Sequence, residues 1–375
     1  MNNDLTYTVD LKLSPKDFAV VDLFCGVGGL TRGLIDENLT VSAGIDFDET
    51  CEYAYHKNNS TKFVHKDISE LSAEELISFY PTGKQRILVG CAPCQPFSNH
   101  SNRIRKSRQE KAQLEVQEDK KWKLLYEFLR LIRETNPVII SMENVPQLRN
   151  HKVFDDFVAG LKALNYHISD YKTPVFCPDY GVPQKRLRLV LLASKLGPIE
   201  MIPAEFDPES YPTVYDVIGE DKLASLVDGE VSAEDPLHRA RKLSPINLRR
   251  IKSLKQGENW TKLDSDLISP CHKKENGKTF TVAYGRMRWN EQAPTITTHC
   301  IGFSNGRFGH PVQNRAISLR EAALLQSFPS KYDFIEDTEK MNVGTLARHI
   351  GNAVPPKLGA AIARSIKRHI DGYGK

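Results

Sequence analysis

The chain has 375 residues, of which 40% are hydrophobic and 26% charged, and its formal net charge is +4. These values are ordinary for a globular protein with a sizeable core, and they exclude a disordered or polycationic chain. The length allows one large domain and a smaller one. We expect neither a membrane span nor a signal peptide, because no long apolar run is present. Seven scattered cysteines favour reduced thiols and a cytoplasmic location.

The first third of the chain predicts a strand, a glycine turn and a helix in that order. Residues 18–24 form an apolar run, Cys25-Gly-Val-Gly-Gly29 follows, and residues 30–35 have helical spacing. This order lets the backbone approach a ligand near a helix N-terminus. The alternative is a plain glycine-rich turn. The candidate cofactor contacts of this turn are Gly26, Gly28 and Gly29.

Two acidic residues follow the next two predicted strands. The strand at 41–45 leads into Asp46-Phe47, and the strand at 62–65 is followed by Asp67-Ile68. A carboxylate at the first position can accept both ribose hydroxyls, and the second position suits an adenine edge. The glycines lack the G-x-G-x-x-G spacing and the lysine of a P-loop, so an adenosine cofactor without pyrophosphate is favoured. S-adenosylmethionine fits, with S-adenosylhomocysteine as its product.

A proline-rich turn follows the apolar run at 87–89. Its sequence is Cys91-Ala-Pro-Cys-Gln-Pro96, and the prolines restrict the backbone around Cys94. A thiol on a rigid turn beyond a strand suits a nucleophile, whereas a buried core thiol is the alternative. Cys91 and Cys94 also have C-x-x-C spacing, so a thiol–disulfide oxidoreductase remains open.

Two further segments bring polar groups to predicted strands. The strand at 137–142 ends at Glu143, and the ligand crevice of an open α/β sheet lies at such ends. A glutamate beside a thiol can act as a proton donor. In the apolar stretch 181–192, Arg186 and Arg188 are two residues apart, so on a strand they project to the same face. They could form a salt-bridged edge or, if they point at the crevice, hold a phosphate or a base carbonyl.

Basic segments predict a nucleic-acid surface. Residues 99–111 are polar and basic, which predicts a mobile loop before an amphipathic helix around 122–132. Later stretches mix arginine, aromatic residues and glycine, as suits loops that enter a DNA groove, although an ordinary solvated surface is the alternative. The candidate DNA contacts are Gln95, Ser98, Arg103, Arg105, Arg249, Arg250, Arg286, Arg288 and Arg307. Two Cys-His pairs match no usual zinc spacing, so we expect no metal site.

Taken together, these segments resemble the DNA (cytosine-5)-methyltransferase family. The resemblance spans almost the whole chain, and six motifs in the family's order are far more specific than any one of them. The matching segments are Asp22–Gly29, Pro93–Gln95, Glu143–Val145, Gln184–Arg188, Arg320–Pro329 and Gly351–Pro355. Two small departures are Cys25 in the glycine turn and Lys185 within the arginine motif.

The resemblance implies a fold and a role for each site residue. It implies a Rossmann-like α/β methyltransferase domain at 1–195, a small target-recognition domain at 196–320 and a segment at 321–375 that returns to the first domain. Cys94 would attack C6 of a flipped-out cytosine, Glu143 would contact N3, and Arg188 would hold the base carbonyl with support from Arg186. The implied cofactor contacts are Phe24, Asp46, Phe47, Asp67, Ile68, Asn352 and Val354.

The expected partners follow from this resemblance. We expect a monomer that binds double-stranded DNA and not a membrane, with a cognate restriction endonuclease as a candidate functional partner. An RNA cytosine-5 methyltransferase of the same fold and a catalytically idle DNA-binding relative are the alternatives.

Overall fold

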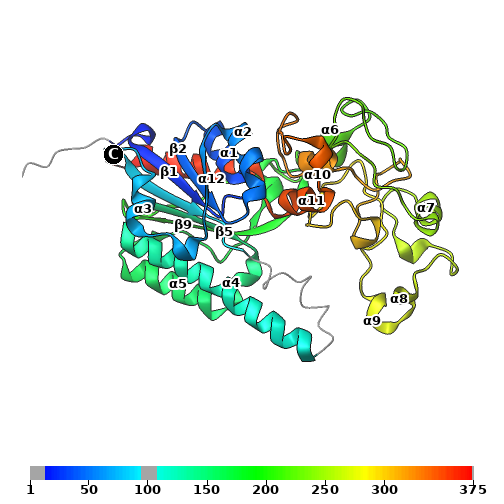
Figure 1. Ribbon diagram of the computed structural model, residues 1–375, viewed down its shortest axis with the longest axis horizontal. Coiled ribbons are helices and arrows are strands. Elements are labelled where there is room, and N and C mark those ends of the chain that lie inside the picture. Colours follow the sequence, from blue (N-terminus) through cyan, green and yellow to red (C-terminus); the bar gives the residue numbers. More distant parts are fainter. Residues whose placement is uncertain (1–12, 94–107, 374–375) are drawn as a thin grey trace, which may run out of the picture.

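The apolar runs of the first 200 residues pair into one central sheet (Figure 1). The computed structural model describes residues 13–93 and 108–373. The strand order is β3-β2-β1-β4-β5-β9-β6, and β7 also pairs with β9. Strands β1 to β5 are mutually parallel, whereas β9 runs antiparallel to β5, β6 and β7. The bounds are β1 Phe18–Leu23, β2 Val41–Asp46, β3 Lys62–His65, β4 Gln85–Gly90, β5 Ile139–Asn144, β6 His167–Ile168, β7 Val175–Phe176 and β9 Leu187–Ser194.

Helices cover both faces of this sheet (Figure 1). One face packs against α3 (Ala73–Ser78), α4 (Arg108–Thr135) and α5 (Lys152–Ala163). The other face packs against α1 (Gly29–Asp36) and α12 (Pro356–Gly372), so the end of the described chain lies against its first helix. Parallel strands buried on both faces explain why their sequences are continuously apolar. The structure therefore confirms the predicted Rossmann-like α/β fold.

Two helix boundaries differ from the sequence predictions. The helical pattern at 346–370 is divided into α11 (Val343–Asn352) and α12, because prolines at 355 and 356 lack the N–H that a helix interior needs. Proline fits the first turn of α12, where no intrahelical partner exists for that N–H. Helix α4 already begins at Arg108, so residues 108–111 are helical and do not belong to the predicted basic loop; the rest of that predicted loop lies outside the described residues.

A smaller lobe with little regular structure lies beside the sheet (Figure 1). Its elements are β8 (Gln184–Lys185), β10 (Ala293–Pro294), α6 (Val214–Ile218), α7 (Pro245–Lys252), α8 (Pro270–Lys273), α9 (Glu275–Lys278) and α10 (Leu319–Leu325). One of its cores surrounds Ile251, Trp260 and Phe303. A second core joins Val27 of the glycine turn to Val214 of α6 and Ile350 of α11, so the two lobes share buried apolar surface. Helix α2 (Glu52–Asn59) also contributes to that second core.

A buried ion pair fixes the start of α10. Arg315 donates to both carboxylate oxygens of Glu321 at 2.7 Å, and Glu321 also closes a capping box with Ser318. Burial would raise the pKa of Glu321, but the hydrogen bonds and charge of Arg315 outweigh it and lower the pKa to about 2. His310 lies 3.7 Å from Glu321, and burial lowers its pKa to about 3.

Among residues 13–93 and 108–373, no helix has the length and apolarity required to cross a bilayer.

Candidate active site

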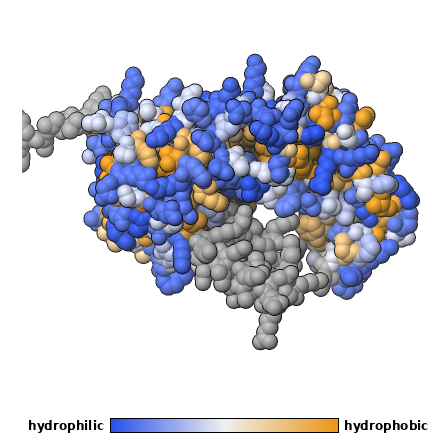
Figure 2. Space-filling model, in the orientation of Figure 1, coloured by the Kyte–Doolittle hydropathy of each residue, from blue (hydrophilic) through white to orange (hydrophobic). Residues whose placement is uncertain are grey.

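A cavity of about 850 Å³ lies at the C-terminal ends of the parallel strands. The space-filling view shows the two lobes on either side of a recess (Figure 2). The wall of the cavity includes the ends of β1, β2, β4 and β5 together with the end of α11. The predicted site residues that line it are Phe24, Gly26, Asp46, Phe47, Asp67, Ile68, Glu143, Arg186, Arg188, Asn352 and Val354.

The wall formed by the glycine turn and Asp46 is built for a polar ligand. Asp46 accepts a hydrogen bond from the Gly26 N–H at 2.8 Å, which fixes the turn against the end of β2. Phe24 has a left-handed φ of 58°, an uncommon conformation for an aromatic residue. A Cβ at Gly26 would meet nothing within 4 Å, so this position faces open space. Phe47 is 66% exposed at the rim, where an aromatic ring can stack on a flat ligand.

Gly28 and Gly29, which the sequence predicts as cofactor contacts, do not line the cavity and instead permit close packing of other segments. A Cβ at Gly28 would lie 2.4 Å from the Asn59 side chain, and one at Gly29 would lie 2.2 Å from the Val354 carbonyl oxygen. Both glycines therefore allow other segments to approach the turn closely. Their effect on a ligand would be indirect, through the position of Val354.

The sequence interpretation missed a group of side chains beside Asp46. Asp48, Arg348 and His349 all line the cavity. Asp48 accepts from Arg348 at 2.9 Å, and its other oxygen accepts from the Thr50 N–H. These contacts join the segment after β2 to α11. The sequence indicates them only through their neighbours: Asp48 follows Phe47, and residues 348–349 come shortly before Asn352, both of which are predicted cofactor contacts.

The opposite wall carries the carboxylate of Glu143. This side chain is 3% exposed, and Arg188 Nε lies 2.7 Å from its Oε1. Cys91 Sγ lies 2.7 Å from its Oε2. Asn144 donates to the Ala92 carbonyl at 3.0 Å, which ties the end of β5 to the turn after β4. The structure thus pairs Glu143 with an arginine from the later strand, a contact that was not predicted from the sequence.

Arg186 is buried between the lobes. Its guanidinium donates to Gln184 Oε1 at 3.2 Å, to the Ile296 carbonyl at 3.0 Å and to the Gly351 carbonyl at 3.5 Å. It thus links the arginine strand to the small lobe and to α11. None of these three contacts is made with Arg188.

Two of the predicted DNA contacts lie inside the small lobe, so those predictions are corrected. Arg286 is 3% exposed, and its guanidinium donates to the carbonyls of Ile251 and His310. Arg250 is also buried, where it donates to the Leu267 carbonyl at 2.7 Å and lies over a tyrosine ring. Both arginines stabilise loops by satisfying carbonyl oxygens that would otherwise be buried without partners.

The remaining predicted DNA contacts divide into two groups. Arg249 and Arg288 are exposed, and Arg307 is half-buried. The predicted nucleophile and four of the predicted DNA contacts lie outside the described residues; these are Cys94, Gln95, Ser98, Arg103 and Arg105.

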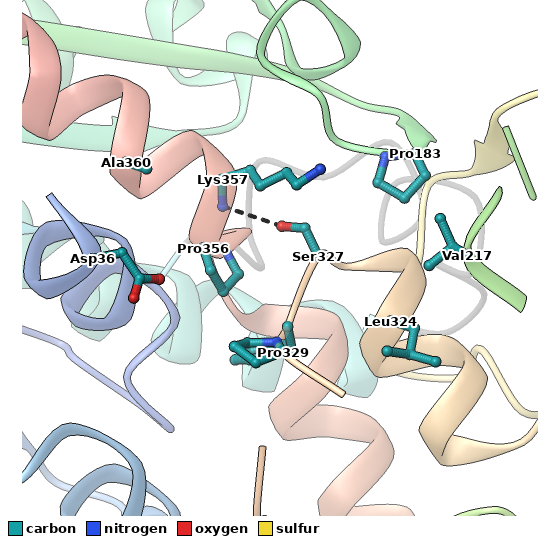
Figure 3. Close-up of a pocket in the computed structure, with 10 residues that line it drawn as sticks. Asp36, Pro183, Val217, Leu324, Ser327, Pro329, Pro356, Lys357 and Ala360 are labelled. Carbon is teal, nitrogen blue, oxygen red and sulfur yellow. Dashed lines mark hydrogen bonds between the residues drawn. The ribbon is translucent and has the colours of Figure 1, made fainter. Parts of the chain in front are cut away.

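A second hollow, of about 310 Å³, lies at the start of α12 (Figure 3). The Lys357 N–H donates to Ser327 Oγ at 3.2 Å, and its ammonium group donates to the Gly181 carbonyl. Asp36, on the opposite side, pairs with Arg32. The charged groups of this hollow are thus engaged within the protein, and it is lined by none of the predicted site residues that the structure describes.

The parallel sheet, with one cavity across its strand ends, defines the Rossmann-like methyltransferase class of fold. A protein described as a DNA modification methyltransferase, encoded within an E. coli prophage, has a crystal structure that matches with a TM-score of 0.68. The two are 22% identical, and the match covers 94% of this chain and 99% of the other. At this identity the likeness shows the fold.

The sequence comparisons show the family. The family model for C-5 cytosine-specific DNA methylase matches residues 18–368. Type II methylase M.HgiDII of Herpetosiphon aurantiacus is 52% identical over 357 residues, covering 94% of this chain and 96% of the relative. Type II methyltransferase M.Eco47II of Escherichia coli is 27% identical, covering 98% of this chain and 82% of the relative.

The chain therefore belongs to the C-5 cytosine-specific DNA methylase family. It is a DNA cytosine-5 methyltransferase, and the RNA methyltransferase and oxidoreductase alternatives are not favoured.

Proposed function

We propose that the cavity holds S-adenosylmethionine against one wall and a flipped-out cytosine against the other. The observation that carries this proposal is that Asp46 and Glu143, from strands on opposite sides of β1, line the same cavity. A volume of about 850 Å³ is within the range of pockets that bury a ligand of this size. This arrangement would keep the methyl group of the cofactor close to C5 of the cytosine.

The residues of the first wall fit an adenosine cofactor. Asp46 would accept the ribose hydroxyls, Phe24 would lie against the adenine with Phe47 stacking on it from the rim, and Asp67 would accept from the adenine amine. Asn352, at the end of α11, and Val354, just beyond it, would close the pocket, while the bare backbone at Gly26 leaves room beside the turn. When bound, S-adenosylmethionine supplies an electrophilic methyl group.

The residues of the second wall would make cytosine reactive at C5. Addition of the Cys94 thiolate to C6 would turn the ring into an enamine-like nucleophile. Glu143 would hydrogen-bond N3 and stabilise the charge that develops there, in a site from which water is excluded. Arg188 would hold the base carbonyl and keep the Glu143 carboxylate in place. C5 would then take the methyl group from the sulfonium, with S-adenosylhomocysteine as the leaving group. Loss of the C5 proton to water and elimination of the Cys94 thiolate would release the methylated base.

The small lobe would read the DNA. We assign target recognition to residues 196–320 and phosphate or base contacts to the surface arginines, Arg249, Arg288 and Arg307. Gln95, Ser98, Arg103 and Arg105 would contact the target strand after the cytosine leaves the duplex. Since two of the similar proteins are named Type II enzymes, we also propose a role in restriction–modification, with a cognate endonuclease as functional partner.

Bisulfite sequencing tests this function and finds the target site at the same time. The protein is expressed in a host without cytosine methylation, beside a Glu143→Gln variant and a Glu134→Gln control on the exposed end of α4. We expect 5-methylcytosine at one short sequence with the wild type and the control, and little with Glu143→Gln. An absence of new 5-methylcytosine in DNA from cells that contain folded wild-type protein would refute the proposal.

A further inference from the structure

We propose that Cys91 is a positioning residue for Glu143, whose Oε2 it holds while Arg188 holds Oε1. The inference rests on the proposed function, because it gives Cys91 a part in setting the carboxyl group that faces the target cytosine. It replaces the redox role that the C-x-x-C spacing suggested.

Strand register places Cys91 beside Glu143. Strands β4 and β5 are parallel neighbours in which Gly90 pairs with Met142, so the next residue on each strand also lies side by side. The Cys91 N–H donates to the Leu23 carbonyl at 3.3 Å, which holds this position against the end of β1. The side chain is half-buried and lines the cavity.

Few polar groups reach the Glu143 carboxylate from the described elements. Arg188 approaches it from β9, and Arg186 lines the same cavity. The thiol of Cys177 is buried and does not line the cavity; burial and, to a lesser extent, the charge of Glu143 raise its pKa. The Cys91 thiol is the group within hydrogen-bond distance of Oε2, at 2.7 Å. Two contacts from different strands therefore fix both oxygens of one carboxyl group.

A thiol suits this position because its hydrogen bond is weak. A sulfhydryl is a poor donor compared with a hydroxyl or an ammonium group. It can orient the carboxyl group before the base arrives, and it can be given up when the carboxyl group, in its protonated form, donates a hydrogen bond to N3 of cytosine. Small errors in the position of a catalytic group are costly, so loss of this contact should slow the reaction more than it weakens binding.

A double-mutant cycle tests the proposal. Single-turnover methylation is measured at saturating DNA and S-adenosylmethionine for the wild type, Cys91→Ala, Cys91→Ser, Glu143→Gln and Cys91→Ala/Glu143→Gln. We expect Cys91→Ala to lower the rate about tenfold, with both dissociation constants within about twofold of the wild type. Cys91→Ser should restore most of the rate, and Cys91→Ala should add almost nothing to Glu143→Gln.

The control is Cys300→Ala, which removes a thiol buried in the core shared by the lobes. It should leave the single-turnover rate unchanged. The proposal is overturned by a wild-type rate in Cys91→Ala, by a serine variant as slow as the alanine variant, or by additive effects in the double mutant. Failure of the proposed function would look different, because the wild-type protein itself would then form no 5-methylcytosine.

Discussion

Arg188 Nε lies 2.7 Å from Glu143 Oε1 across two neighbouring strands, and both side chains line one wall of the cavity. The antiparallel register of β5 and β9 creates this pair, since Glu143 faces Val190 and Arg188 lies two residues further along. An ion pair that is mostly buried has a fixed geometry, and removal of either partner leaves an uncompensated charge. The pair therefore gives the predicted chemistry a defined orientation.

Replacement of the Glu143 carboxylate should reduce chemistry and not binding. Glu143→Gln keeps the size of the side chain but removes the carboxyl group, which as the anion pairs with Arg188 and as the acid would donate to N3. We expect the single-turnover methylation rate to fall about 10²- to 10³-fold, with DNA affinity changed by less than about threefold. Rapid-quench measurement of methyl transfer and fluorescence anisotropy with labelled DNA check the two parts. A normal rate would exclude Glu143 from the mechanism.

Substitution of two arginines that are adjacent in the sequence, one exposed and one buried, should affect DNA binding and stability differently. Arg249 is exposed, so Arg249→Ala should reduce the salt dependence of DNA binding by about one unit of slope, with almost no loss of stability. Arg250 is buried and bound to the Leu267 carbonyl, so Arg250→Met should mainly destabilise the fold, by about 2–4 kcal/mol. Salt titration of DNA affinity and urea unfolding separate the two effects. The reverse pattern would contradict the buried position of Arg250.

The exposed ring of Phe47 provides a test of the cofactor wall. Because the side chain is 66% exposed, Phe47→Ala should cost little stability. Loss of stacking on adenine should weaken S-adenosylmethionine binding about 10- to 30-fold, which calorimetry can measure. Val227→Ala, a change at another highly exposed apolar residue, serves as the control. Equal affinity in wild type and Phe47→Ala would place the adenine elsewhere.

The buried group around Glu321 should make the protein less stable in acid. The pKa of Glu321 is lowered to about 2 from its ordinary 4.5, so the stability it contributes is present above about pH 4.5 and is lost as the pH falls toward 2. The pKa of His310 is lowered to about 3 from 6.5, so the unfolded chain takes up that proton first and stability already falls below about pH 6.5.

Urea unfolding between pH 7.5 and 4 measures this dependence. His310→Gln should flatten the curve between about pH 6.5 and 5, where Glu321 still remains ionised in both states. The same change at His65, which is exposed, should leave the curve as in the wild type. An unchanged slope in His310→Gln would mean that the histidine is not held neutral by its burial.

The strand ends could be predicted from the sequence, because buried parallel strands are continuous apolar runs and the polar residue after each run stands out. Asp46 and Glu143 were found in this way, and both line the cavity. The two-residue period of the strand predicts that Arg186 and Arg188 share a face. It gives no information on the carbonyl groups of other segments that accept hydrogen bonds from Arg186.

The small lobe could not be predicted to the same extent. Its arginines lie in loops with no period, so the sequence does not distinguish an exposed Arg249 from a buried Arg250 beside it. Burial of Arg286 depends on carbonyl groups of residues far along the chain, and no local pattern reports them. Arg348 and His349 were missed for the same reason, since only the fold brings α11 to the end of β2.

The central claim is that the Cys94 thiolate adds to C6 of the target cytosine. The most direct test uses a duplex whose target cytosine carries fluorine at C5, because the missing proton prevents elimination and the adduct persists. After reaction with S-adenosylmethionine and digestion, mass spectrometry should find the modified base on the peptide that contains Cys94, at the sulfur of that residue. An adduct on Cys91, or none under conditions in which the natural duplex is methylated, would contradict the account.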